Sequence, residues 1–284
     1  MTLSPRHLGL ALVFTSSLAW STAGLFTRAA DTDLATIIVW RGIFGTLGML
    51  AVLLVFQGWA GLTRIFRPGR SGWAYVLVSV LTLPAYLGSL QLTSIAHVAI
   101  IYATVPFMTA GLAWLVLRER PSRSAVIAAS LAVLGAVIMM GLGSEGSFLG
   151  DALALSMTFG MAVLVVMARK DPQIPALAAG ALATGITVAI ALPLVGFVLP
   201  AGDKLVILAA FGLLHSLFGF TLFLLGSSRI PAIETALIGA LESPIAPIWV
   251  WIVFAETPTP ATLFGGGIVI AAVFWHLWRS ARAG

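Results

Sequence analysis

The 284-residue sequence contains no cysteine, no asparagine and little charge, since only 9% of its residues are Asp, Glu, Lys or Arg. The absence of cysteine excludes disulfides and thiol chemistry, and the absence of asparagine removes the acceptor for N-glycosylation. A soluble domain has about 25% charged and about 45–50% apolar residues, whereas this chain is 60% hydrophobic. With a mean hydropathy of +1.08, the sequence excludes an ordinary soluble domain and indicates that lipid surrounds most of the chain.

The net charge of +5 would suggest a nucleic-acid partner in a soluble protein. In a membrane protein the same excess is typical of Lys and Arg in cytoplasmic loops. The sequence also contains no P-loop, H-E-x-x-H or G-x-S-x-G motif, and Gly141–Gly146 reads as a loop because no strand is expected before it. We therefore expect membrane lipid and a small-molecule substrate as partners, with no nucleic acid, no cofactor, no metal and no obligate protein partner.

Charges, prolines and glycines divide the chain into ten apolar stretches near the ~20 residues that a spanning helix needs. The expected spans are 8–27, 34–56, 73–92, 96–117, 124–142, 150–168, 174–198, 205–225, 231–254 and 260–278. Alternate connections hold twelve and two of the 15 Lys and Arg residues, and the remaining one, Arg41, lies inside the second span. This asymmetry predicts that both termini lie in the cytoplasm.

A nine-residue stretch, Trp114–Ser122 (WLVLRERPS), recurs as Trp251–Thr259 (WIVFAETPT), 137 positions later. The recurrence predicts two units, residues 1–143 and 144–284, with five spans each. Because five is odd, the second unit enters the membrane from the other side. The expected fold is therefore all-α and membrane-embedded, with two inverted five-helix repeats, an arrangement that recurs in transporters working by alternating access.

The regions around this repeat resemble a known family. Ala96–Ser122 reads AHVAIIYATVPFMTAGLAWLVLRERPS and Ala232–Thr259 reads AIETALIGALESPIAPIWVWIVFAETPT. Both are similar to the signature of EamA-type carriers of the drug/metabolite transporter superfamily, and the general likeness is greatest to the bacterial YddG branch of aromatic amino acid exporters. The resemblance implies a secondary carrier, not an enzyme, in the bacterial inner membrane, exporting aromatic or other hydrophobic amino acids.

Two prolines are candidate hinges in these regions. Pro106 removes a backbone donor in the middle of its span and predicts a bend there. When the closing stretches are aligned, Pro106 falls on Ser243, and Pro244 comes one residue later. This offset predicts that the helix of the second repeat bends at a different height.

Polar and aromatic side chains at helical spacing are candidate cavity residues. Ser79, Thr82 and Tyr86 share one face of the third span with two further hydroxyls; they either line a wet cavity or pack between helices. Trp20 lies deep for a tryptophan and either stacks on an aromatic substrate or packs in the core. In the fourth span Tyr102 lies one turn deeper than His97, which is either a titratable site residue or an interfacial histidine.

Ionisable groups inside the spans are the sharper candidates. Arg41 could hold a substrate carboxylate or pair with an acidic side chain. His215 and Glu242 lie near the middle of the eighth and ninth spans, where a carboxylate must be paired, protonated or hydrated. Glu242 could bind a substrate ammonium, carry a coupling proton, or form a fixed pair. The repeated glutamates, Glu119 and Glu256, are expected at opposite membrane faces in structural roles.

Two other classes of protein compete with a carrier. An integral-membrane enzyme acting on lipids would need a cluster of nucleophile, base or metal ligands near one interface, whereas the candidate histidines and Glu242 are scattered in depth. A channel would be expected to contain rings of charged side chains, which are rare here. Within transport, the alternative is a carrier for another metabolite or a toxic compound.

Overall fold

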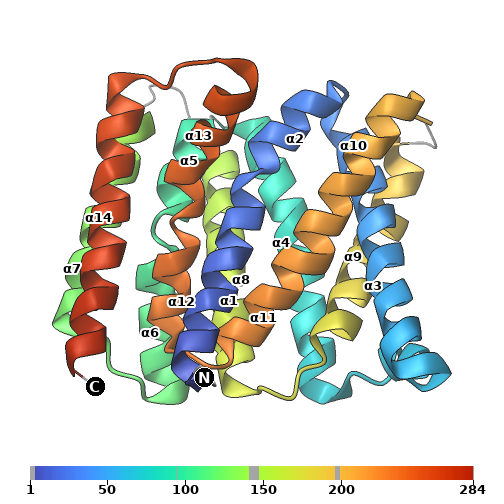
Figure 1. The fold of residues 1–284 in the computed structure, drawn as a ribbon, viewed down its shortest axis with the longest axis horizontal. Helices are drawn as coiled ribbons and strands as arrows, with labels where there is room; N and C mark the ends of the chain where they lie inside the picture. Colours follow the sequence, from blue (N-terminus) through green and yellow to red (C-terminus); the bar gives the residue numbers. More distant parts are fainter. Residues whose placement is uncertain (1–3, 94, 141–146, 196–198, 284) are drawn as a thin grey trace.

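A computed structural model of the chain describes residues 4–93, 95–140, 147–195 and 199–283. These residues form fourteen α-helices and one π-helical segment, and none of them is in a strand. Some consecutive helices follow one another directly or after a break of one or two residues, so ten helical passages run between the two ends of the molecule (Figure 1). The passages are α1–α2 (Pro5–Ser21, Ala23–Ala30), α3 (Leu34–Ile65), α4 (Gly69–Leu92), α5–α6 (Ile95–Tyr102, Val105–Leu117), α7 (Arg123–Met140), α8 (Phe148–Lys170), α9 (Ala176–Val195), α10–η1–α11 (Gly202–Gly212, Leu213–Gly219, Phe220–Ser227), α12–α13 (Ala232–Gly239, Glu242–Phe254) and α14 (Pro260–Ala283).

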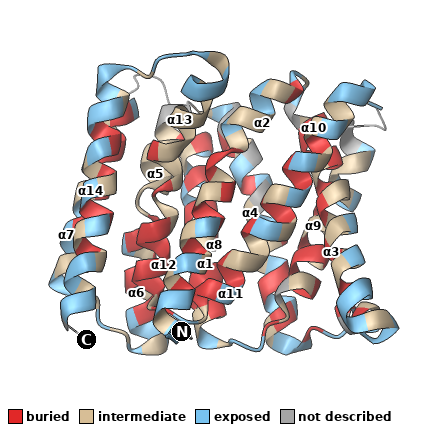
Figure 2. Ribbon diagram, viewed as in Figure 1, coloured by how far each residue is buried: buried red, intermediate tan, exposed pale blue. Residues whose placement is uncertain are grey.

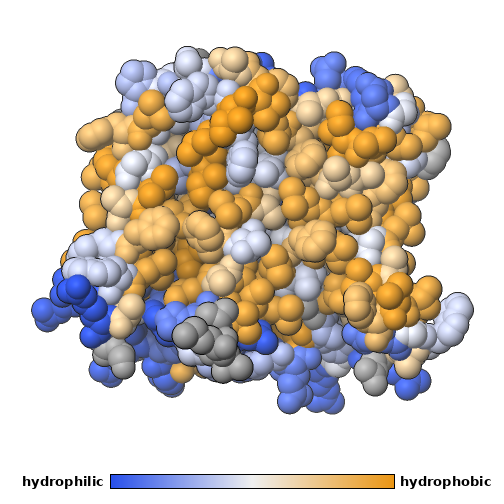
Figure 3. Space-filling view, in the orientation of Figure 1, coloured by the Kyte–Doolittle hydropathy of each residue, from blue (hydrophilic) through white to orange (hydrophobic). Residues whose placement is uncertain are grey.

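The surface fits a membrane protein. Eight helices in the described ranges are long and apolar enough to cross a membrane, and Leu177–Pro193 is a shorter apolar helix. Hydrophobic side chains cover the middle of the molecule, and hydrophilic ones gather at its ends (Figure 3). The predicted all-α membrane fold is confirmed. Both termini lie at the lower end in Figure 1; we call this end the termini face and the other end the opposite face.

Particular helix pairs build the interior. α7 packs along α14 and α3 along α9, while α4 packs on α8 and α1 on α11. α8 also contacts α6, and α1 also contacts α12. Small residues permit the closest approaches: a Cβ on Gly45 of α3 would lie 2.4 Å from the Cβ of Ser216 in η1. Gly45 therefore allows α3 and η1 to approach each other closely.

The broken helices α5–α6 and α12–α13 have the same register. Each pair of corresponding ends is 137 positions apart: α5 ends at Tyr102 and α12 at Gly239, and α6 begins at Val105 and α13 at Glu242. The backbone hydrogen bonds at the breaks also correspond, since Thr104 N–H donates to Ile101 O at 3.0 Å and Leu241 N–H donates to Ile238 O at 3.1 Å.

The expectation that the second repeat bends at a different height is therefore wrong. Pro106 is the second residue of α6 and Pro244 the third residue of α13. The first N–H groups of a helix have no intrahelical partner, so a proline is tolerated anywhere in this turn. A shift of one position leaves the break where it is.

Two irregularities were not predicted from the sequence. The first passage is interrupted at Thr22, whose hydroxyl donates to Ala19 O at 2.6 Å. The eighth passage contains the π-helical segment η1, Leu213–Gly219, and π-helical turns are frequent at functional sites.

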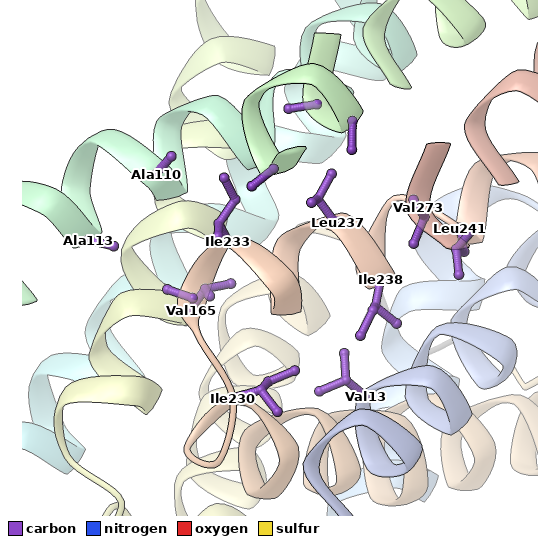
Figure 4. Packing of buried hydrophobic residues seen from close by; sticks show 14 of the residues in the cluster. Val13, Ala110, Ala113, Val165, Ile230, Ile233, Leu237, Ile238, Leu241 and Val273 are labelled. Carbon is purple, nitrogen blue, oxygen red and sulfur yellow. The ribbon is translucent and has the colours of Figure 1, made fainter. Parts of the chain in front are cut away.

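The buried residues run through the middle of the molecule, most densely around α1, α8 and α12 (Figure 2). The main cluster includes Val13 of α1, Val165 of α8 and Leu237 of α12, which are drawn in Figure 4. The predicted boundary between the units, 143/144, and the Gly141–Gly146 loop lie outside the described residues.

Candidate functional site

Two cavities share one wall residue, Trp20 of α1. The first, which we call the break cavity, has a volume of about 30 Å³, and the second, the arginine cavity, about 180 Å³. Trp20 lines both of them. Sites for small molecules usually measure about 300–1,000 Å³. A substrate larger than a few waters therefore requires the surrounding helices to move apart.

The break cavity is built around the two helix breaks. Its wall includes Tyr102 and Pro106 from the first break, and Gly239 and Ser243 from the second. α6 and α12 are in contact, which brings the two breaks to one place. Because Pro106 has no N–H, it cannot donate to the carbonyl of Tyr102, four residues earlier. Irregular backbone of this kind is tolerated at membrane depth only where it is buried in protein or lines a cavity.

The arginine cavity brings together several of the predicted residues. Arg41 of α3, Ser79 of α4 and His215 of η1 line it, together with Thr184 and Thr187 of α9. The Arg41 guanidinium lies 5.4 Å from the centre of the Phe211 ring, and no carboxylate in the described part of the chain forms an ion pair with it. Two roles were expected for Arg41, holding a substrate carboxylate or pairing with an acidic side chain. Among the described residues the second is not seen, and the guanidinium faces a cavity lined by hydroxyl groups and His215.

Hydrogen bonds to the π-helical segment fix Trp20. Its indole Nε1 donates to His215 O at 3.2 Å, and the Ser16 hydroxyl one turn earlier donates to Gly219 O at 2.7 Å. The ring lies 4.9 Å from the ring of Phe223, centre to centre. A Cβ on Gly219 would lie 2.4 Å from the indole Nε1, so only glycine leaves room for the indole at this position.

His215 is held from the other side by α1. Its Nε2 lies 3.3 Å from the Thr22 hydroxyl, at the break between α1 and α2. Its ring meets the ring of Phe211 edge-on at 4.5 Å. Both irregularities that the sequence did not predict, the Thr22 break and η1, therefore meet at the cavity wall.

Glu242 lies at the second helix break, directly before a wall residue of the break cavity. It is the first residue of α13, where the positive end of a helix dipole stabilises a carboxylate. Its neighbour Ser243 lines the cavity, but Glu242 is not among the lining residues. No side chain in the described ranges forms an ion pair with it. Tyr86 is 39% exposed and is not among the lining residues of either cavity.

Three predicted residues lie in other surroundings. The Thr82 hydroxyl donates to Val78 O at 2.7 Å and packs where α8 has Gly160. His97 pairs with Asp151 of α8, Nδ1 to Oδ1 3.1 Å, and neither cavity includes it in its wall. Pro244 is buried against Gly266 of α14.

Some residues of the site were missed. The fixing hydrogen bond of Ser16 and the need for glycine at position 219 depend on the π-helical turn, which has no sequence signature. Thr184 and Thr187 lie three residues apart on α9, so helical spacing could have found them. The predicted residues that the structure does bring together are those at the two cavities: Trp20, Arg41, Ser79, Tyr102, Pro106 and His215.

The arrangement is suited to binding a small molecule. The cavity walls offer aromatic rings, hydroxyl groups, a histidine and a guanidinium. In the described ranges no three His, Asp or Glu residues are placed to hold a metal ion. The fold and this site define a polytopic helical membrane protein with a central binding region.

Comparison with known proteins gives the family. The EamA-like transporter family model matches residues 7–141 and again residues 148–278. The chain belongs to the EamA-like transporter family and is a membrane transporter. An uncharacterized transporter from Archaeoglobus fulgidus is 24% identical over 274 residues, which cover 95% of this chain and 96% of that protein. A crystal structure with 19% identity superposes with a TM-score of 0.81, covering 98% of this chain and 99% of that one, and shows that the fold is shared.

Proposed function

We propose that the protein is a secondary carrier that exports small amphipathic metabolites, most of all aromatic and other hydrophobic amino acids, by alternating access. The observation that carries this proposal is the meeting of two equivalent helix breaks at one cavity, beside Trp20. Broken helices at a repeat interface recur in carriers with a substrate site near the midplane. The class is a carrier rather than a lipid-modifying enzyme, because the family whose model matches both halves is a transporter family.

The inverted five-helix repeat, 1–143 and 144–284, is part of the proposal, and three observations support it. The same family model matches each half. The main helix contacts are preserved when the halves are exchanged: α7–α14 and α3–α9 map onto themselves, α4–α8 onto α11–α1, α6–α8 onto α13–α1, and α5–α8 onto α12–α1.

Two ion pairs between the halves also correspond to each other when the halves are exchanged. Glu119 pairs with Arg169, Oε1 to Nε 2.9 Å, and Glu256 pairs with Arg28. The glutamates are 137 positions apart. The arginines are 141 positions apart, the same offset that separates the first matched residues, 7 and 148. Two like halves that face each other in this way can exchange conformations, and this exchange would expose the site to each side in turn.

The proposed roles of the site residues follow from their charges and shapes. Arg41, without an acidic partner, holds the substrate carboxylate, and the Trp20 indole stacks on its side chain. Glu242 holds the ammonium group or carries a coupling proton. Ser79, Tyr86, Tyr102 and His215 complete the polar wall, and the breaks at Pro106 and Pro244 supply the hinges. A folded Glu242→Gln variant is expected to lose export or its pH dependence, and unchanged transport across pH would exclude both roles.

The direction of insertion is also proposed from the charges. The termini face holds most of the Lys and Arg residues, so it is assigned to the cytoplasm of a bacterial inner membrane. The alternative within transport is a carrier for another metabolite.

Purified protein in liposomes tests substrate and class together. Vesicles are loaded with single amino acids, and efflux is followed at several pH values and membrane potentials. We expect efflux of tryptophan and phenylalanine and none of aspartate, since a second carboxylate finds no cation beyond Arg41 at the cavity walls. Absence of efflux for every aromatic amino acid would remove the proposed substrate and leave the transporter family unaffected.

A further inference from the structure

We infer that two exchange-related ion pairs are latches that keep the half-helices α12 and α5 closed, and that only the one on the opposite face responds to pH. Arg6–Glu234 is the latch of the termini face, and His97–Asp151 that of the opposite face. The inference rests on the proposed alternating access, because it assigns the two gates of that cycle.

The two pairs occupy corresponding positions in the halves. His97 is the third residue of α5, and Glu234, 137 positions later, is the third residue of α12. Their partners, Asp151 and Arg6, lie in the first turns of α8 and α1, the helices that open the two halves. Each latch therefore joins the half-helix of one repeat to the first helix of the other.

Each half-helix connects its latch to the binding region. α5 and α12 have eight residues each, a length of about 12 Å at 1.5 Å per residue. Their inner ends, Tyr102 and Gly239, line the break cavity. When a latch opens, the half-helix can swing about the break and open a route from that face to the cavity.

The latch on the termini face joins a buried carboxylate to a guanidinium that is 32% exposed. The histidine beside it is His276 of α14, which is buried and lies 3.0 Å from the Ser124 hydroxyl through its Nδ1. The Glu234 carboxylate accepts from Arg6 Nη2 at 3.1 Å and from the Ser280 hydroxyl at 2.6 Å, and its side chain is 4% exposed. All residues of α12 from Ala232 to Ile238 are buried, and Ile233 and Leu237 lie in the main core cluster (Figure 4). An arginine remains charged at every physiological pH.

The latch on the opposite face is wetter and titratable. The His97 and Asp151 side chains are 26% and 34% exposed, and the Thr93 hydroxyl at the end of α4 donates to Asp151 Oδ1 at 2.7 Å. Among the residues of α5 with described side chains, only Val98 is buried. This half-helix is therefore less tightly held than α12.

Asp151 is the charged group that faces His97 from the described helices packed on α5. These helices are α4, α7 and α8, and α4 and α7 carry their only permanent charges, Arg70 and Arg123, at the termini face. A histidine loses its charge between about pH 5 and 8. As the pH rises, the attraction to Asp151 weakens and the opposite face opens, while the termini face keeps its latch.

Because the chain has no cysteine, a single Ala103→Cys at the first break reports access to the cavity. A membrane-impermeant methanethiosulfonate is added to one face of oriented vesicles at about pH 5.5 and about pH 8. Rates are divided by those of the denatured protein, which removes the pH dependence of the thiol. We expect labelling from the opposite face to rise about threefold to fivefold with pH, the range that a partly exposed ion pair allows.

Variants assign the effect to the latches. Asp151→Asn is expected to give the fast rate from the opposite face at both pH values, and the exchange His97→Asp with Asp151→His to restore the pH response. His7→Asn, which removes an exposed histidine of the termini face, is the matched control and leaves the response unchanged. Glu234→Gln is expected to speed labelling from the termini face at both pH values.

Equal pH responses at the two faces, or an Asp151→Asn variant that labels like the parent, would overturn the latches. The measurement needs no substrate, so it is separable from the proposed function. If labelling responds to pH and to the variants but no amino acid is exported, the latch proposal holds and the proposed substrate is wrong. If amino acids are exported but none of these variants changes labelling, the proposed substrate holds and the latch proposal is wrong.

Discussion

The indole Nε1 of Trp20 donates a hydrogen bond to the main-chain carbonyl of His215 at 3.2 Å. This bond joins α1 to the π-helical segment of the other half, and Trp20 lines both cavities. Trp20 is therefore the residue through which packing and binding are most directly connected.

Trp20→Phe keeps an aromatic face and loses the donor, whereas Trp20→Ala loses both. We expect Trp20→Ala to weaken binding of an aromatic amino acid at least about tenfold, since aromatic contacts and burial together exceed ~1.4 kcal/mol, and Trp20→Phe to weaken it less. Isothermal titration in detergent measures both affinities. Trp278→Ala, at a tryptophan that is 53% exposed on α14, is the control, and equal losses for Trp278 and Trp20 would contradict the assignment.

Gly219→Ala is expected to displace the indole, because the new Cβ would lie 2.4 Å from its Nε1. Overpacking of this kind costs about 1–3 kcal/mol, and binding should weaken with it. Gly111→Ala is the matched control, since a Cβ there meets nothing within 4 Å and alanine favours a helix. Thermal unfolding of both variants gives the comparison. A Gly219→Ala variant as stable as Gly111→Ala would show that the fit is not as close as described.

The repeated glutamates are expected to differ in their contributions to stability. Glu119 accepts from Arg169 and also from the Ala232 N–H at the start of α12, at 3.3 Å. Glu256 pairs with Arg28, and both side chains are about half exposed. Glu119→Ala should cost about 1–2 kcal/mol through the lost cap and pair, and Glu256→Ala less than about 1 kcal/mol. Unfolding midpoints measure the difference, and the reverse order would refute the structural role of Glu119.

Single cysteines test the proposed topology. Arg67, between α3 and α4, is exposed at the termini face, and Asp203, at the start of α10, is exposed at the opposite face. An impermeant thiol reagent applied to intact cells should label Asp203→Cys and spare Arg67→Cys. Labelling of both residues from one side would contradict the assignment of the termini face to the cytoplasm.

The helical architecture followed from hydropathy, because a lipid environment leaves few alternatives to apolar helices. The helix breaks were predicted only in part from the sequence. Pro106 indicated the first break, whereas the one-residue shift of Pro244 suggested that the second break lies at another height. That inference failed because any position in a first helical turn accepts proline. The π-helical turn at His215 could not be predicted, since it has no sequence signature and its carbonyls accept from Ser16 and Trp20 of a helix far away in sequence.

The placement of charged side chains was predicted less well than that of the helices. The sequence shows that Arg41 and His97 are unusual, but not which element supplies a partner. The structure gives His97 the carboxylate of Asp151 and gives Arg41 none among the described residues. That difference depends on tertiary packing between segments far apart in sequence. Because of this difference, Arg41 is a candidate for binding the substrate carboxylate and His97 is a candidate latch residue.

Counterflow in proteoliposomes tests the central claim most directly. Vesicles loaded with unlabelled tryptophan are diluted into a trace of labelled tryptophan, and internal label is followed with time. A carrier whose two halves alternate around one site exchanges the labelled molecule for the unlabelled one. The account therefore predicts that internal label rises transiently above equilibrium and that Trp20→Ala reduces this overshoot. A monotonic approach to equilibrium at the same total flux would indicate an open pathway and contradict alternating access.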